Sequence, residues 1–257
     1  MKRRLHTLVL DIGGTGLKAS VLDRAGRMLV KRVRVATPYP CPPDVLLKTL
    51  DSLAAKLPAF DRISVGFPGV VRNGRILTAP HFGEHPWRDY PLAAALSRRL
   101  GKPVRLLNDA EVQGFGIVKG RGLEVVLTLG TGAGTAVFRD GALMPHLELA
   151  QHPIHGKETY NDYIGDGALR REGVKKWSRH VHKAIGILYA LLHYDVLYLG
   201  GGNGKKVIGR PAGVRVASND TGITGGIRLW DEDVEQSLFH DTGGHGRAKP
   251  WHARETR

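Results

Sequence analysis

Two glycine-rich turns and one aspartate are the residues of this chain whose types and spacing could do chemistry. The first turn follows a short apolar run and reads D-I-G-G-T at residues 11–15. The second also follows an apolar run and reads G-T-G at residues 130–132. Glycine lets a backbone approach an anion closely, and the N–H groups of such a turn can bind phosphate oxygens. Between the turns, Asn108-Asp109 ends a predicted strand. Two phosphate-type turns around one candidate base are the layout expected of a phosphotransferase.

Composition restricts the class of protein. A chain of 257 residues can form one large domain or two small ones. The single cysteine, Cys41, excludes an intramolecular disulfide and a cysteine-rich zinc site. No apolar run could span a bilayer, and the basic start leads into a core strand rather than a signal peptide, so we expect a cytoplasmic protein. The net charge of +14 favours a polyanionic partner such as nucleic acid, polyphosphate or a membrane surface, or it reflects genomic composition or solubility alone.

Hydrophobic patterning predicts an alternation of strands and helices. Strands are expected on either side of each glycine turn, within residues 8–18 and 125–135. Further strands are expected from 62 to the G-F-P-G turn at 66–69 and at 28–35, 103–107, 195–199 and 214–217. Helices are expected at 44–57 (with Asp44 as N-cap), 91–100, 110–119, 160–171, 175–193 and 223–230. Each half begins with a strand, a glycine turn and a returning strand. This weak repeat predicts two similar α/β lobes with a cleft between them.

Five motifs, in order, resemble the ROK (repressor, open reading frame, kinase) family of the sugar kinase/hsp70/actin superfamily. They are L-V-L-D-I-G-G-T-G-L-K from residue 8, G-F-P-G-V-V from 66, L-L-N-D-A from 106, L-T-L-G-T-G-A-G-T from 127 and L-Y-L-G-G-G-N from 197. Within the family, P-H-L-E-L-A-Q-H-P-I from residue 145 and the lack of a zinc-binding cysteine cluster are most similar to polyphosphate glucokinases. No helix-turn-helix precedes the first motif, which disfavours the repressor branch.

The resemblance implies two ribonuclease H-like (actin-like ATPase) lobes. They would comprise residues 1–108 and 109–230, and the last helix could pack back on the first lobe. Residues 231–257, where hydrophobic residues are sparse, are expected to be a disordered tail. The implied activity is phosphorylation of the 6-hydroxyl of glucose with ATP or inorganic polyphosphate and Mg²⁺, by a homodimer.

The resemblance also implies a role for individual residues. Asp109 would be the general base, and Asp11 would bind Mg²⁺ through water. Phosphate would be bound by Gly13, Gly14, Thr15, Lys18, Gly130, Thr131 and Gly132. The sugar would be bound by Gly69, Asn108, Asp109, Glu148, Gln151 and His152, with His81, His85 and Trp87 near the entrance. Adenosine would contact Gly200, Gly201, Gly202 and Asn203, and Lys205 and Lys206 could meet further phosphates.

Structural alternatives exist for these residues. Asn108-Asp109 could simply cap a helix, Asp11 could form an Asx turn, and the glycines could serve hairpins alone. Lys205 and Lys206 could be an exposed basic turn.

The sugar side departs from the family pattern, which leaves the substrate open. The family shows Glu-x-Gly-His where this chain has Glu148-Leu149-Ala150-Gln151, so either Gln151 or His152 would take the histidine's place. This difference leaves another hexose or an amino sugar open as substrate. A non-catalytic protein that binds a sugar or a polyanion is the alternative of another class. A nucleic-acid binder is disfavoured because the basic residues are scattered without interleaved aromatic residues, and no membrane partner is expected.

Overall fold

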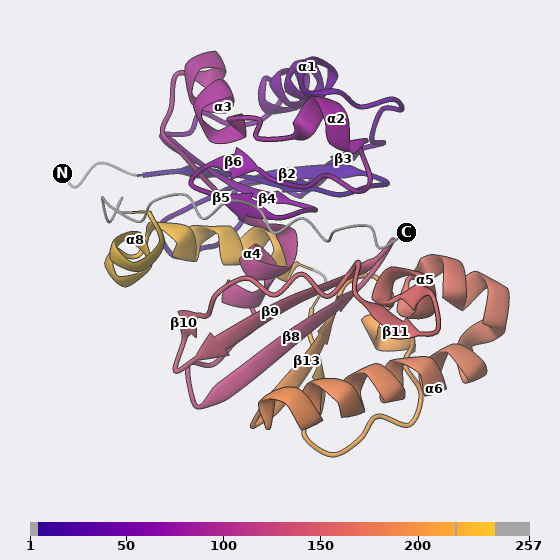
Figure 1. The fold of residues 1–257 in the computed structure, drawn as a ribbon. Coiled ribbons are helices and arrows are strands. Elements are labelled where there is room, and N and C mark those ends of the chain that lie inside the picture. Colours follow the sequence, from indigo (N-terminus) through magenta and orange to yellow (C-terminus); the bar gives the residue numbers. More distant parts are fainter. Residues whose placement is uncertain (1–4, 219, 240–257) are drawn as a thin grey trace, which may run out of the picture.

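The computed structural model describes residues 5–218 and 220–239, and within them two five-stranded sheets share one topology (Figure 1). The first sheet has the order β3-β2-β1-β4-β7, formed by β1 (Thr7–Ile12), β2 (Leu17–Leu22), β3 (Val33–Val35), β4 (Arg62–Phe67) and β7 (Val104–Asn108). The second has the order β10-β9-β8-β13-β14, formed by β8 (Leu123–Leu129), β9 (Ala133–Arg139), β10 (Ala142–Leu143), β13 (Val196–Gly200) and β14 (Val214–Val216). In each sheet an antiparallel meander is followed by two strands parallel to its first strand.

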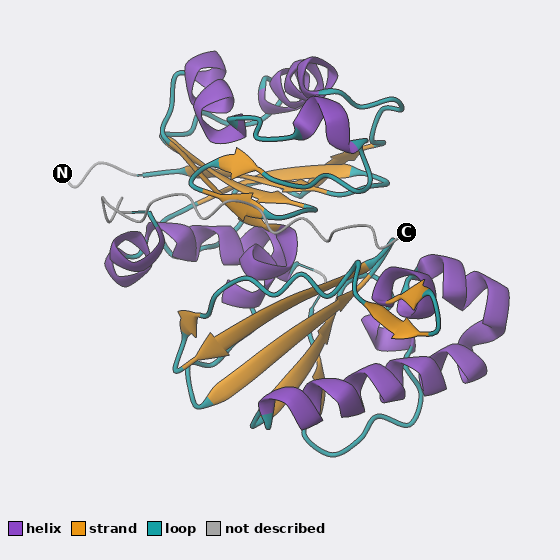
Figure 2. Cartoon of the chain, in the orientation of Figure 1, coloured by secondary structure: helices purple, strands orange, loops and turns teal. Residues whose placement is uncertain are grey.

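Helices cover the outer faces of the sheets and fill the layer between them (Figures 1 and 2). The first sheet is covered by α1 (Pro43–Ala54), α2 (Glu84–Trp87) and α3 (Leu92–Leu100), and the second by α5 (Tyr160–Ile164) and α6 (Asp166–Leu192). The middle layer contains α4 (Asp109–Phe115), α7 (Thr221–Thr224), the 3₁₀ helix η2 (Gly225–Trp230) and α8 (Glu232–Leu238). Two small hairpins, β5 (Val71–Arg72) with β6 (Arg75–Ile76) and β11 (Pro153–His155) with β12 (Glu158–Thr159), and the 3₁₀ helix η1 (Gly204–Lys206) complete the described elements.

The sheets are buried on both faces, which explains why their central strands lack an apolar–polar alternation. On the outer side, α1 packs Leu46 and Leu50, one helical turn apart, into the core of the first sheet. The second sheet has an equivalent core, into which α6 packs Trp177 and Val181. A third cluster lies between the sheets and includes Val112 of α4. The two sheets are therefore joined through a shared apolar layer.

Helix α4 is held close to its neighbours by glycines. A Cβ atom at Gly225 would lie 2.0 Å from the carbonyl oxygen of Val112, so only glycine lets η2 approach α4 this closely. On the other side, a Cβ atom at Gly66 would lie 3.2 Å from Cα of Asp109. The first residue of α4 is thereby fixed against the end of β4, in the layer between the two sheets.

Several predicted boundaries differ from the structure. Helix α1 begins at Pro43 after Pro42, without a side-chain cap, so Asp44 lies in the first turn and is not the N-cap. The strand predicted for 28–35 is reduced to Val33–Val35.

The helix predicted for 160–171 is divided between α5 and α6. Gly165 separates the two helices, and Gly173, with φ 71° and ψ 159°, kinks α6 where a break between two helices is expected.

The prediction of disorder from residue 231 is wrong for Glu232–Leu238, which form α8. Val234 is buried in the apolar layer between the sheets, and Glu235 forms an ion pair with Arg105 of β7. The guanidinium of Arg105 also lies 4.1 Å from the ring centroid of Trp230. These contacts compensate for the low hydrophobicity of the segment. Residues 240–257, the rest of the predicted tail, lie outside the described residues.

The segment 221–230 contacts the first sheet, although it follows the second sheet in sequence. The hydroxyl of Ser64 in β4 donates to the carbonyl of Gly226 at 2.7 Å and accepts from Nε1 of Trp230 at 2.8 Å. The division of the chain into lobes at residue 108 stays a prediction. Among the described helices, none combines the length and the apolar character needed to cross a bilayer.

Candidate active site

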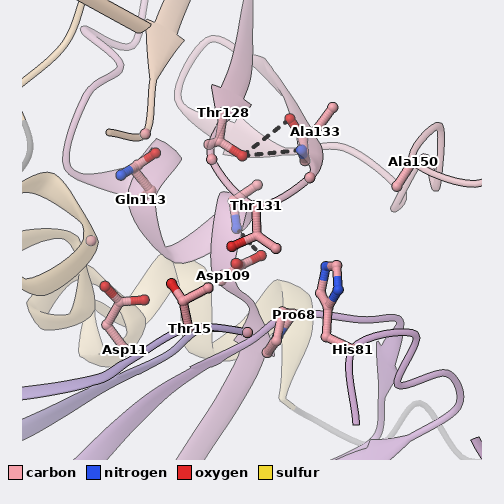
Figure 3. A pocket seen from close by; sticks show the side chains of 18 of the residues that line it. Asp11, Thr15, Pro68, His81, Asp109, Gln113, Thr128, Thr131, Ala133 and Ala150 are labelled. Carbon is pink, nitrogen blue, oxygen red and sulfur yellow. Dashed lines mark hydrogen bonds between the residues drawn. The ribbon is translucent and has the colours of Figure 1, made fainter. Parts of the chain in front are cut away.

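A cavity of about 300 Å³ lies where the ends of β1, β4, β7, β8 and β13 converge on the start of α4 (Figure 3). Its lining brings together most of the residues that the sequence singles out. They are Asp11, Gly13, Gly14, Thr15, Lys18, Gly69, His81, Asn108, Asp109, Gly130, Thr131, Gly132, Glu148, Gly201 and Gly202. The two glycine turns therefore belong to one site, with Asp109 between them.

The end of β7 and the start of α4 fix the position of Asp109. Asn108 is the N-cap of α4, and its side-chain oxygen accepts from the N–H of Ala110 at 2.9 Å. Glu111 completes a capping box, because its Oε2 accepts from the N–H of Asn108 at 3.0 Å. The amide of Asn108 also donates to the carbonyl of Gly69 at 3.0 Å. Asn108-Asp109 thus caps a helix, and the cap holds Asp109 at the cavity.

The environment of Asp109 favours its protonated form. Burial is the main cause, and the nearby carboxylate of Asp11 adds to it, so the pKa rises from 3.8 to about 7. The N–H of Ala110, which donates to Asp109 at 2.9 Å, and the charge of Lys18 act in the opposite direction. A carboxyl group with a pKa near neutrality can accept a proton and release it again.

The first glycine turn carries an ion pair. Lys18, on the returning strand β2, lies with Nζ 2.8 Å from Oδ2 of Asp11. The turn itself closes with a hydrogen bond from the N–H of Gly13 to the carbonyl of Gly16 at 3.1 Å. Arg34 lines the cavity beside this turn, and its guanidinium donates to the carbonyl of Thr15 at 3.1 Å. Two basic side chains, Lys18 and Arg34, therefore lie beside the first turn, and they could contact a bound phosphate.

The second glycine turn is held by side chains from outside it. The N–H of Gly130 donates to the carbonyl of Gly132 at 2.9 Å. Thr128 Oγ1 accepts from the N–H of Gly134 at 3.1 Å (Figure 3). Asn161 of α5 accepts from the N–H of Ala133 at 2.8 Å. The turn is thus fixed before any ligand is bound.

On the sugar side, the structure brings Glu148 to the cavity but neither Gln151 nor His152. Leu149 is buried in the core of the second sheet, and the N–H of His152 donates to its carbonyl at 2.9 Å. Gln151 and His152 then lie exposed, with the ring of His152 6.3 Å from that of Tyr160. Neither candidate for the place of the family histidine therefore lines the cavity, and their role in sugar binding stays a prediction.

Two other histidines lie near Glu148. The ring of His81 would contact a Cβ atom placed at Gly14, at 3.2 Å, and burial lowers its pKa, against the charge of Glu148. His146 lies with Nε2 3.4 Å from Glu148 and with Nδ1 2.7 Å from Glu111.

The predicted adenosine motif is only partly exposed to the cavity. Gly201 and Gly202 line it, whereas Gly200 and Asn203 do not. Asn203 instead donates to Asp166 at the start of α6, at 3.1 Å, and a Cβ atom at Gly200 would lie 2.4 Å from Oε1 of Gln113. Gly200 and Asn203 therefore contact neighbouring protein residues and hold Gly201 and Gly202 in place at the cavity.

Sequence reasoning overlooked Gln113, Arg34, His146 and Asn161. Gln113 could have been found, because it lies one helical turn after Asp109 on α4 and therefore on the same face. Its Oε1 atom is buried without a hydrogen-bond partner among the described residues. Arg34 and Asn161 reach the cavity from distant segments, and His146 contacts Glu148 beside it, and no local pattern indicates these contacts.

Comparison with known proteins gives relatives along most of the chain. The model of the ROK family matches residues 7–147. A polyphosphate glucokinase from Mycobacterium tuberculosis is 29% identical over 210 residues, which are 78% of this chain and 79% of that protein. A glucokinase from Thermotoga maritima is 29% identical over 150 residues, 55% of this chain and 47% of that protein.

Solved structures agree with this relationship. The inorganic polyphosphate/ATP-glucomannokinase from Arthrobacter sp. strain KM has a TM-score of 0.79 and 27% identity, covering 88% of this chain and 97% of that one. A ROK family glucokinase from Streptomyces griseus, in complex with glucose and AMPPNP, has a TM-score of 0.74 and 20% identity, covering 87% and 98%. The predicted actin-like ATPase fold is confirmed. The motifs, the fold and the match of the family model over more than half of the chain agree, and this chain belongs to the ROK family.

Proposed function

We propose that this protein is a sugar kinase that transfers a phosphoryl group from ATP or inorganic polyphosphate to the 6-hydroxyl of glucose. The observation that carries the proposal is Asp109, whose carboxyl group lies between two glycine turns in one cavity and has its pKa raised to about 7. The relatives named glucokinase and polyphosphate glucokinase are phosphotransferases that act on an alcohol group, and this chain is assigned to the same class.

In the proposed reaction, Asp109 is the general base. Its ionised carboxylate accepts the proton of the sugar hydroxyl, which becomes acidic as the bond to the phosphorus forms. The N–H groups of the two turns bind the donor phosphates on either side. Lys18 offsets negative charge at the first turn, next to Asp11. Phosphoryl transfer depends mainly on such positioning and charge neutralisation, since the transition state is loose.

The residues present fit a hydrated Mg²⁺ ion. No group of three or more His, Cys, Asp or Glu side chains that could hold a metal occurs among the described residues. Mg²⁺ in kinases retains waters and uses one or two carboxylates together with substrate phosphates, so a full protein cage is not required. Asp11 would hold the ion through water, and the unpartnered Oε1 of Gln113 is a further acceptor nearby. The ion would neutralise part of the negative charge of the phosphates.

The donor is proposed from the relatives and from the charge of the chain. A polyphosphate chain is a long polyanion, and the net charge of +14 suits it. Lys205 and Lys206 lie in η1, just beyond Gly201 and Gly202 of the cavity lining. ATP would use the same two glycines for its adenosine. We also propose a cytoplasmic homodimer.

A second candidate keeps the reaction and changes the sugar. Gln151 stands where the family has a histidine, and it does not line the cavity. Relatives of this chain include an N-acetylmannosamine kinase from Citrobacter koseri, 29% identical over 157 residues, 59% of this chain and 54% of that protein.

A panel of sugars and donors tests the proposal. Initial rates would be measured with glucose, mannose and N-acetylmannosamine, each with ATP and with polyphosphate, and phosphorylated products would be identified by mass and NMR. The proposal predicts glucose 6-phosphate as the fastest product. A fast amino sugar would favour the second candidate. Binding of a sugar without turnover by any donor would support a non-catalytic binding protein.

A further inference from the structure

His146 is held between two carboxylates that belong to different parts of the fold. Its Nδ1 lies 2.7 Å from Oε1 of Glu111 on α4, and its Nε2 lies 3.4 Å from Oε2 of Glu148. The exposed fractions of the three side chains are 17% for His146, 6% for Glu111 and 29% for Glu148. Both contacts are therefore largely shielded from water, where charged hydrogen bonds are strong.

The geometry dictates the charge of His146. An ionised carboxylate only accepts hydrogen bonds, so each ring nitrogen that meets one must carry a proton. A neutral imidazole has a proton on one nitrogen and could satisfy only one of the two carboxylates. Burial disfavours the charged form, but the hydrogen bonds and charges of Glu111 and Glu148 outweigh it and raise the pKa of His146 to about 9. The ring is thus an imidazolium at neutral pH.

The remaining oxygens of the two carboxylates are also engaged. Oε2 of Glu111 accepts from the N–H of Asn108 at 3.0 Å, directly before the proposed base Asp109. Oε1 of Glu148 accepts from the N–H of Ala150 at 3.2 Å. A continuous chain of hydrogen bonds therefore runs from Glu148, through His146 and Glu111, to the residue that precedes Asp109.

Both ends of this chain, Glu148 and Asn108, face the cavity, and its middle does not. Glu148 lines it, whereas His146 and Glu111 do not. His146 therefore acts through Glu148 and does not contact the substrate. The segment that carries His146 is tied to the second sheet, because Thr135 donates to the carbonyl of Leu147 at 2.6 Å. Glu148 is in this way fixed relative to both sheets.

We propose that His146 is a positioning residue, which holds Glu148 oriented to accept a hydroxyl of the sugar and ties it to the turn that carries Asp109. The inference rests on the proposed sugar-kinase function for its kinetic consequence. Other charged groups near Glu148 are His81 and Asp109, whose pKa values Glu148 raises. Neither of them replaces His146, because among the described residues neither forms a hydrogen bond with Glu148.

The first experiment measures the protonation of His146 without any activity. A titration of histidine ring signals by NMR would use His146→Gln to identify the signal. We expect His146 to lose its proton near pH 9 in the wild type. In Glu111→Gln, which keeps an oxygen for the helix cap, its pKa should fall by at least about one unit, since one charge is removed. Titration of His146 near 6.5 in the wild type would overturn the inference.

The second experiment separates sugar binding from the chemical step. At pH 7.5, His146→Gln should raise the KM for the sugar about tenfold, as expected for loss of a charged hydrogen-bond network, with kcat within threefold and the donor KM unchanged. In the wild type, the sugar KM should rise above pH 9 toward the value of the variant, and the variant should lack this rise. A sugar KM that stays flat with pH in the wild type, or an equal change in donor KM, would contradict the role.

The controls keep the two proposals apart. His193→Asn alters an exposed histidine at the C-terminus of α6, where φ is 47° and asparagine is tolerated, and it should change neither KM. If His146→Gln does not fold by circular dichroism, Glu111→Gln carries both measurements. If no sugar is phosphorylated, the proposed function fails; the NMR titration and calorimetric sugar binding then decide on His146 independently.

Discussion

Replacing Asp109 by asparagine should stabilise the protein while it removes the base. The structure raises the pKa of this carboxyl from 3.8 to about 7, chiefly by burial, so the folded state disfavours the charged form. In the unfolded chain the group ionises from about pH 4 upward. The cost to the free energy of unfolding therefore grows between about pH 4 and pH 7 and is constant above pH 7.

The size of the effect follows from the shift. About three pKa units correspond to roughly 4 kcal/mol at pH 8, and to roughly 1.5 kcal/mol at pH 5, where the folded carboxyl is still protonated. Asparagine has the same shape, remains neutral and can keep the hydrogen bond from the N–H of Ala110. We expect the free energy of unfolding of Asp109→Asn to exceed that of the wild type by up to these amounts, with the gain larger at pH 8 by roughly 2.5 kcal/mol.

Urea unfolding at pH 5 and pH 8 measures this difference, with the exposed Asp233→Asn as the matched control. The control should show no comparable gain at either pH. An equal gain from Asp109→Asn at both pH values, or a loss at pH 8, would refute the reasoning, since Asp109 would then not be held neutral by its surroundings.

Three further predictions concern the phosphate and sugar sides. Asp11→Asn should move the acid limb of the pH profile of kcat/KM to lower pH by up to about one unit, because the charge of Asp11 raises the pKa of Asp109. The variant should also need a higher Mg²⁺ concentration for half-maximal rate. An acid limb that does not move would contradict this coupling. Changing Lys205 and Lys206 together to alanine should lower kcat/KM for polyphosphate several-fold and weaken its salt dependence, with little effect on ATP, as rates over a range of salt would show. Gly69→Ala should lower the free energy of unfolding by about 1–3 kcal/mol and raise the KM for the sugar, since the new Cβ atom would lie 2.1 Å from the carbonyl oxygen of Thr78. The control is Gly167→Ala, which has open space around it and should be neutral or stabilising.

The sequence was sufficient to predict the fold and the central residues, because the information for both is local. Strand, glycine turn and returning strand occur twice in short windows, and each is read from apolar runs and glycine alone. Asn108 and Asp109 follow an apolar strand directly, so their place at a strand end required no knowledge of the rest of the chain. Both turns and Asp109 line one cavity, as their motifs indicate.

Part of the sugar side could not be predicted, because it depends on contacts between distant segments. Gln151 and His152 were singled out by comparison with the family pattern Glu-x-Gly-His, but Leu149 is buried and both of these residues are exposed. His146 precedes Glu148 by two residues, and its role depends on Glu111, which is 35 residues away in sequence. No periodic pattern in the sequence connects these two residues.

The prediction of disorder from residue 231 was wrong for a related reason. Helix α8 has few hydrophobic residues, and its place depends on the pairing of Glu235 with Arg105 in the first sheet. Such a contact across 130 residues leaves no local signature.

The measurement that tests the central claim most directly is the rate of glucose 6-phosphate formation by Asp109→Asn at pH 8, compared with the wild type. The urea unfolding above verifies that the variant is folded, and calorimetry verifies that it binds glucose. If Asp109 is the base, kcat should fall by about 10²–10⁴-fold while sugar binding is retained. A kcat within about threefold of the wild type would show that another group accepts the proton and would contradict the proposed mechanism.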